Sequence, residues 1–215
     1  MLGLRLEALE RPLRLLCLGA HADDIEIGCG GTIMTLIASQ PVSCTWVVWS
    51  ASAERRREAE ASAGEILRGA RETRIELEDF RDSYFPDQWA ALKHRVEELK
   101  SVEPDLILTH HVADRHQDHA TVAALTWQTW RNHMILEYEV PKYDGDLGRP
   151  SLFIPLDAGV AQRKLELLAR AFPSQAGRQW FDPETFRGLM RLRGVECAAP
   201  SGYAEAFHAS KVTLG

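Results

Sequence analysis

A buried apolar run that stops at three acid–base side chains constrains this chain more than any other feature. Residues 15–20 are almost wholly apolar, and His21, Ala22, Asp23 and Asp24 follow before a glycine-rich stretch. A short apolar run bounded by turn residues is typical of a buried parallel strand. Ligands of open α/β sheets bind beyond the carboxyl ends of such strands. We therefore expect His21, Asp23 and Asp24 at the edge of the sheet where ligands bind.

A second run of the same kind occurs later in the chain. Residues 106–109 are again suited to a buried strand, and residues 110–119 follow directly. That segment holds four of the eight histidines, together with two aspartates: His110, His111, His116, His119, Asp114 and Asp118. Two predicted strands therefore end in complementary sets of metal-ligating and acid–base side chains.

The rest of the chain alternates between strand-like and helix-like stretches. We expect strands over residues 13–20, 43–50, 71–77, 105–109 and 152–156. Apolar residues at helical spacing predict helices over residues 32–39, 51–68, 89–102, 121–133, 160–172 and 183–193. Such alternation favours a three-layer α/β/α fold with a mostly parallel sheet. No linker or internal repeat interrupts it, so residues 1–215 are expected to form a single domain.

Charge and hydropathy exclude several classes of function. The formal net charge is −6, whereas nonspecific nucleic-acid binding relies on a basic surface. No apolar stretch approaches the roughly 18 residues of a membrane span. Residues 1–12 carry no apolar core of a secretory signal, so we expect a cytoplasmic protein.

Neither the cysteines nor the glycines predict a cofactor site. The four cysteines, Cys17, Cys29, Cys44 and Cys197, form no CxxC pair, and we expect them to be structural. Residues 28–31 match neither the dinucleotide-binding nor the P-loop glycine pattern, and the two aspartates before them would repel phosphate. A metal ion, if bound, would be held by nitrogen and oxygen ligands.

The chemistry of the two strand ends predicts a metal site. His21 and Asp24 are three residues apart on a predicted tight turn, and His119 comes from the second strand end. Two nitrogens and one carboxylate oxygen, with a position left open for water, are the ligands of a catalytic zinc site. Zinc acidifies its water and polarises a carbonyl.

Three further side chains suit acid–base roles. Asp23 stands next to a predicted ligand and is placed to accept a proton from water. His116 lies one helical turn before His119 and can protonate a departing amine. Asp118 is expected to orient His116 by a hydrogen bond. Together with a metal ion, these groups describe the hydrolysis of an amide.

The same residues also have purely structural interpretations. An isolated histidine after a strand is usually a surface or a satisfied residue. Aspartates at positions 23 and 24 are also suited to capping the helix that follows. The coincidence of two such motifs at two strand ends favours the metal hydrolase.

At these residues the sequence resembles the LmbE-like (PIG-L) family of zinc-dependent N-deacetylases. The family motif AHPDD followed by GxGGT appears as residues 20–24 and 28–32, and HPDH appears as residues 116–119. Lys164, the Ser174–Gln175 pair and residues 203–207 (YAEAF) match later family segments. Ala22 and Gln117 replace the two motif prolines, and neither position supplies a ligand.

The resemblance implies a Rossmann-like, LmbE-like fold and a set of roles for the residues that match its motifs. It assigns His21, Asp24 and His119 to Zn²⁺, Asp23 to the base, and His116, with Asp118 beside it, to the oxyanion and the amine. It also implies a homo-oligomer and a small-molecule substrate, an N-acetylglucosamine-type conjugate. Arg55 or Arg56 matches an arginine that contacts substrate in related enzymes.

Three functions therefore compete. The first is a zinc-dependent hydrolase that removes the acetyl group from an N-acetylated amino sugar. The second is an amidase that cleaves a larger amide conjugate of an amino sugar. The third is a non-catalytic sugar- or metal-binding protein on the same fold, against which the presence of both a base and an acid argues.

Overall fold

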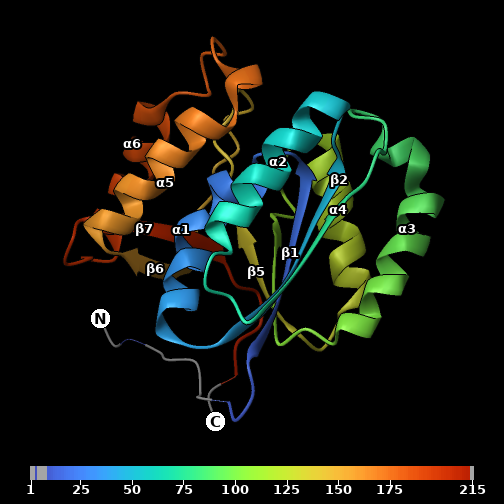
Figure 1. Ribbon diagram of the computed structural model, residues 1–215, viewed down its shortest axis with the longest axis horizontal. Coiled ribbons are helices and arrows are strands. Elements are labelled where there is room, and N and C mark those ends of the chain that lie inside the picture. The colour runs from blue at the N-terminus through green and yellow to red at the C-terminus, as the bar shows by residue number, and fades with distance from the viewer. Residues whose placement is uncertain (1–2, 4–8, 214–215) are drawn as a thin grey trace.

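The computed structural model describes Gly3 and residues 9–213, and seven strands within this part form one sheet in the order β3-β2-β1-β4-β5-β7-β6 (Figure 1). The strands are β1 (Leu13–His21), β2 (Val42–Ser50), β3 (Glu72–Leu77), β4 (Leu106–His110), β5 (Met134–Tyr138), β6 (Leu152–Leu156) and β7 (Tyr203–His208). The α-helices are α1 (Asp24–Ser39), α2 (Ala53–Ile66), α3 (Trp89–Glu98), α4 (Gln117–Thr129), α5 (Ala158–Ala171) and α6 (Pro183–Glu196). Short 3₁₀ helices are η1 (Phe85–Gln88), η2 (Leu99–Val102) and η3 (Pro173–Gln175).

The sheet is the middle of three layers. Strands β1 to β5 pair in parallel, and β7 is antiparallel to both β5 and β6. Along β1, Leu15 and Cys17 join the core under α1, α2, α5 and α6, while Leu16 and Leu18 join the core under α3 and α4 (Figure 1). Both faces of the sheet are thus covered, which is why its central strands β1, β2 and β4 consist mainly of apolar residues. The predicted fold class is confirmed.

The order of the strands places the predicted site at a topological switch point. After β1 the chain moves outward to β2 and β3, and it then returns to lay β4 on the other side of β1. The crevice between two strands whose connections leave in opposite directions is the usual ligand site of such sheets. His21 ends β1, and residues 110–119 begin at the end of β4.

Helix α1 begins eight residues earlier than the sequence pattern predicts, so its glycines lie inside the helix. They allow close packing. A Cβ on Gly28 would lie 2.2 Å from Cδ2 of Tyr138, and one on Gly31 would lie 2.6 Å from Leu156 and 2.9 Å from Glu205. Glycines stand where a helix normally has apolar side chains at helical spacing, so the sequence pattern does not show the first turns of α1. The same glycines allow α1 to pack closely against the sheet.

Strands β5 and β7 are absent from the sequence expectations because each contains a buried glutamate. Glu205 of β7 binds Nζ of Lys164 at 2.6 Å and accepts the backbone N–H of Gly31 at 2.9 Å and of Thr32 at 2.7 Å. Glu137 of β5 is fully buried and bonds to His111 and Trp127. A buried charge needs partners. Here those partners come from distant parts of the chain.

No helix in the described part of the chain is long and apolar enough to cross a membrane. The prediction that residues 1–12 lack a secretory signal falls largely on residues outside those described.

We expect Gly28→Ala to destabilise the protein by about 1–3 kcal/mol, because the new methyl group overlaps the buried ring of Tyr138. Gly64→Ala in α2 is the matched control. There an added Cβ meets nothing within 4 Å, and alanine should stabilise the helix by about 0.5–1 kcal/mol. Urea unfolding of the two variants measures both effects, and equal stability of the two would contradict the packing argument.

Asp105 provides a pH-dependent contribution to stability. Arg11 donates to both of its oxygens at 2.6 and 2.7 Å, and the Arg14 backbone N–H donates at 2.9 Å. The bonds from Arg11 lower the pKa of Asp105 to about 2. A carboxyl whose pKa is lowered on folding stabilises the fold above its unfolded pKa and loses that effect as the pH falls toward its folded pKa.

We therefore expect Asp105→Asn to be less stable than the parent protein at pH 6, by about 0.5 kcal/mol because the pair is partly exposed. The difference should shrink between pH 4 and about pH 2. Urea midpoints at several pH values measure it. A difference that does not change with pH would show that the charge of Asp105 does not matter.

Candidate metal centre and catalytic site

The turn between β1 and α1 sets the positions of the first group of site residues. Asp23 has φ 117° and ψ −24°, a backbone conformation that is costly for any residue with a side chain. Asp24 Oδ2 accepts the backbone N–H of His21 at 2.7 Å. The Asp23 side chain makes no capping hydrogen bond to α1, so the helix-cap interpretation does not describe its contacts.

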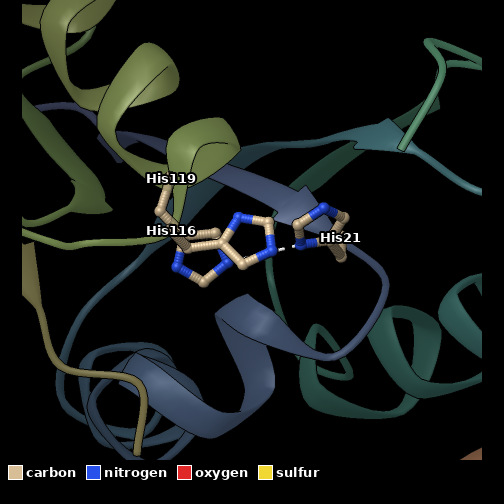
Figure 2. Close-up of side chains that lie close together, drawn as sticks. All are labelled: His21, His116 and His119. Atoms are coloured by element: carbon tan, nitrogen blue, oxygen red, sulfur yellow. Dashed lines mark hydrogen bonds between the residues drawn. The ribbon is translucent and has the colours of Figure 1, made fainter. Parts of the chain in front are cut away.

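His21, Asp24 and His119 converge as the sequence predicts. His119 Nε2 lies 3.3 Å from His21 Nδ1 and 3.5 Å from Asp24 Oδ1, and His21 Nδ1 lies 3.4 Å from Asp24 Oδ2. Figure 2 shows His21 at the end of β1 facing His119, while His116 stands beside His119 at the start of α4. Atoms that bind one zinc ion tetrahedrally at about 2.0–2.2 Å lie about 3.3–3.6 Å from one another. The two histidine nitrogens have this spacing, and each lies within 3.5 Å of one oxygen of Asp24, Oδ2 for His21 and Oδ1 for His119.

The outward-facing nitrogens of both histidines are bound to carboxylates. His119 Nδ1 lies 2.9 Å from Asp114 Oδ2. His21 Nε2 lies 3.1 Å from Asp118 Oδ2 and 3.2 Å from Asp82 Oδ1. A metal-binding histidine almost always donates its second N–H to such a group, which fixes the ring and raises its basicity. The surroundings of these histidines therefore also fit a metal centre.

The titration of these groups agrees with a ligand role. Burial, with the adjoining imidazole of His110, lowers the pKa of His119 to about 4, so its imidazole is neutral. Burial opposes the charge on Asp24, but His119 and His110 outweigh it and lower the pKa of Asp24 well below its usual value. Burial likewise opposes protonation of His21, whereas bonds to Asp118, Asp24 and Asp82 raise its pKa well above 6.5. A metal ion would displace that proton.

Other groupings of ligands fit less well. In the described part of the chain, His21–His116–His119, Asp24–His110–His119 and His21–Asp82–Asp118 are also close enough to hold an ion. His110, however, stacks on His119 at 3.9 Å, and its Nε2 accepts the backbone N–H of Ala20 at 2.9 Å. In the third set Asp82 is exposed, and the Asp118 carboxylate already accepts the backbone N–H groups of Ser83 and Phe85. His111 stacks on His208 instead of facing the site.

The carboxylate of Asp118 has different hydrogen-bond partners from the one predicted. Its carboxylate is fully buried and accepts the backbone N–H of Ser83 at 2.6 Å and of Phe85 at 3.0 Å, in addition to bonding His21. Its hydrogen bond to His116 is made by the backbone N–H instead, at 3.3 Å from Nδ1. Asp118 therefore orients His21 and fixes the backbone of the segment that leads into η1. The prediction that its carboxylate orients His116 was wrong, because α4 begins at Gln117 and turns that side chain away.

His116 is held beside the ligands. Its ring centroid lies 5.0 Å from that of His21 and 4.6 Å from that of His119. Because Nδ1 accepts the Asp118 N–H, the neutral ring carries its proton on Nε2. Burial, followed by the charge of His21, lowers the pKa of His116. The neutral ring thus offers an N–H donor close to the metal ligands.

Asp23 is a buried carboxylate whose charged neighbour is Arg55. The Arg55 Nη2 atom lies 2.9 Å from Asp23 Oδ2. Burial raises the pKa of Asp23 well above its usual value, and Arg55 opposes this shift. Arg55 is largely covered, with 17% of its side chain exposed. Arg56, the other predicted substrate contact, is half-buried on α2, and its side chain makes no hydrogen bond or ion pair within the described residues.

Sequence reasoning did not find the roles of Asp82 and Asp114. Asp114 lies five residues before His119, and its position in the histidine-rich segment was a usable signal. Lys142 binds Asp114 at 3.0 Å and Asp146 at 2.8 Å, so residues after β5 also support His119. Asp82 lies in an irregular turn with no motif, and only the tertiary structure brings it to His21.

Comparison with known proteins identifies a family for this chain. The family model described as GlcNAc-PI de-N-acetylase, PIG-L, matches residues 16–130. The uncharacterized deacetylase YaiS of Escherichia coli K12 is 31% identical over 137 residues, which cover 59% of this chain and 74% of YaiS.

Solved structures share the fold at lower identity. N,N'-diacetylchitobiose deacetylase from Pyrococcus horikoshii superposes with a TM-score of 0.73 at 21% identity, covering 91% of this chain and 82% of that one. The 4-carboxy-2-hydroxymuconate hydratase GalB from Pseudomonas putida KT2440 has a TM-score of 0.72 at 20% identity, covering 94% and 97%. The fold therefore serves more than one reaction, and the side chains must decide the chemistry.

We expect Asp114→Ala to weaken metal binding by about 10–100-fold, because His119 loses the carboxylate that orients it. Asp144→Ala is the matched control, an exposed aspartate in the segment that follows β5. Competition with a chromogenic chelator measures zinc affinity in both variants. Equal affinities would show that Asp114 does not support the metal ligand.

Proposed function

The chain belongs to the PIG-L family of GlcNAc-PI de-N-acetylases, and from that premise we propose that it is a zinc-dependent hydrolase that removes the acetyl group from an N-acetylglucosamine-type conjugate. One observation carries the proposal. The three predicted ligand groups stand 3.3–3.5 Å apart, beside a buried carboxylate and an imidazole that hold no ligand position. A metal-binding module needs neither of these two extra groups.

In this proposal His21, Asp24 and His119 hold the ion. When bound there, zinc supplies Lewis acidity that acidifies water and polarises the amide carbonyl. The protein holds the ligands in place through Asp114 and Asp118, whose bonds to the outer ring nitrogens fix both imidazoles.

Asp23 is the proposed general base. It is adjacent in sequence to Asp24, its carboxylate is 3% exposed, and it makes no capping bond, so the oxygens are not committed to the helix. As the water oxygen bonds to the carbonyl carbon, Asp23 accepts the proton that the water loses. A positioned base of this kind contributes about 10²–10⁴-fold to a rate.

His116 is the proposed donor. Its Nε2–H is directed by the bond at Nδ1 and stands beside the ligand histidines, where it stabilises negative charge on the carbonyl oxygen. For the step that breaks the carbon–nitrogen bond, His116 takes up a second proton from solvent and gives it to the amine nitrogen, which returns the ring to its neutral form, and the proton accepted by Asp23 is released to solvent. Acetate and the free amino sugar are then the products.

The substrate class rests on the relatives. The family model is described by a GlcNAc lipid and the Pyrococcus horikoshii enzyme by diacetylchitobiose, both of which carry N-acetylglucosamine. A small-molecule N-acetylated amino-sugar conjugate is therefore our proposal for this chain. A homo-oligomeric assembly and a cytoplasmic location stay predictions.

We expect the zinc-loaded protein to release acetate from at least one of a panel of N-acetylglucosamine conjugates with sugar, lipid and thiol-bearing aglycones. Asp23→Asn should lower kcat by about 10²-fold or more while zinc content stays unchanged, because the amide cannot accept the proton. An enzymatic acetate assay measures the release, and metal analysis of both proteins excludes loss of zinc as the cause.

The same assay separates the competing functions. An amidase would release a larger acid instead of acetate from a bulkier conjugate, and a binding protein would take up the sugar without turnover. Release of acetate that survives Asp23→Asn would show that another group is the base. No release from any conjugate, with zinc bound, would contradict the deacetylase.

A further inference from the structure

Arg55 has its closest polar contact with the proposed base. Its Nη2 atom lies 2.9 Å from Asp23 Oδ2, and the side chain of Asp23 is 4% exposed. That oxygen has no aligned hydrogen bond from any described residue, so the charge of Arg55 is its main partner. The backbone of Asp23 is itself in an unfavourable conformation at φ 117°. A carboxylate on a strained backbone needs an outside contact to hold one orientation.

The other end of the guanidinium is also occupied within the protein. Arg55 Nη1 donates to Glu58 Oε2 and to Ser174 Oγ, each at 3.1 Å. Its guanidinium carbon lies 5.4 Å from the ring centre of Phe172, which is buried. Arg55 thus has three partners that fix its plane, and its donors face side chains instead of the solvent.

Glu58 and Ser174 hold that arrangement. The backbone N–H of Ser174 donates to Glu58 Oε1 at 2.8 Å, and its hydroxyl donates to Oε2 at 2.6 Å. Glu58 is buried in α2 and Ser174 lies in η3, so the pair joins two segments far apart in the sequence. This contact gives the Ser174–Gln175 motif a physical role. Ser174 and Glu58 together hold Arg55 in the orientation in which its guanidinium contacts Asp23.

We infer that Arg55, held by Glu58 and Ser174, is a positioning residue that fixes the Asp23 carboxylate, in place of the substrate contact that its sequence position suggested. The inference rests on the proposed function only in that Asp23 is the base. Losing the arginine should leave the metal ligands in place, because none of them contacts Arg55. It should misplace the base, and a displacement of about 1 Å is enough to cost on the order of 10²-fold in rate.

We expect Arg55→Ala to lower kcat for acetate release by about 10²-fold with KM and zinc content nearly unchanged. Guanidinium ion at millimolar concentration should restore part of kcat, because it can occupy the space between Asp23 and Glu58. Glu58→Gln, which keeps the shape but removes the charge, should lower kcat by a smaller factor. Arg57→Ala, at an exposed arginine of the same helix, is the control and should leave kcat unchanged.

A thermal double-mutant cycle tests the contact without using activity. In the whole protein, Arg55→Ala should lower Tm by more in the parent than in the Asp23→Asn background, because only the parent keeps a buried carboxylate that loses its partner. Losses that simply add would overturn the inference, as would a rise in KM at unchanged kcat, which marks a substrate contact. Absence of acetate release from the parent protein would refute the proposed function, while the cycle would still decide whether Arg55 holds Asp23.

Discussion

The parallel pairing of β1 with β4 is the constraint on which the rest of this structure depends. The register places Leu15 opposite Leu106 and Cys17 opposite Leu108, so both strands end at the same edge of the sheet. His21 and the turn to α1 then meet the segment that leads into α4. Without that pairing the two motifs, nearly a hundred residues apart in sequence, would have no common site.

The charge balance of the site follows from this arrangement. Asp24, Asp82, Asp114 and Asp118 gather around two imidazoles, and Lys142 is the one lysine or arginine among the described residues that bonds to any of these four carboxylates. The side chains of Asp24, Asp114 and Asp118 are buried, and buried carboxylates require cations or protons for compensation. A divalent cation at the three converging donors meets that requirement. In that arrangement Asp24 would be a ligand, and Asp82, Asp114 and Asp118 would orient the two imidazoles.

Around the site, buried ion pairs replace ordinary apolar packing. Lys164 and Glu205 join α5, α1 and β7, whereas Glu58 joins α2 to η3 and Arg55 joins α2 to the turn before α1. Each of these contacts is made by a charged residue with no more than 17% of its side chain exposed. Breaking such a pair leaves an uncompensated buried charge, so loss of either partner alone is expected to destabilise the arrangement of the helices.

The sequence by itself determined the central strands and the layer order and predicted the candidate ligands, because apolar runs and the His–Asp motifs are local signals. It did not determine the start of α1, because the glycines there are explained only by packing against residues such as Tyr138. It did not determine β5 or β7 either, because their buried glutamates depend on partners elsewhere in the chain, such as Lys164 for Glu205. The partner of Asp118 and the place of Arg55 were likewise decided only by the tertiary structure. A side chain's type limits what it can bind, but which atom it meets depends on how separate segments pack.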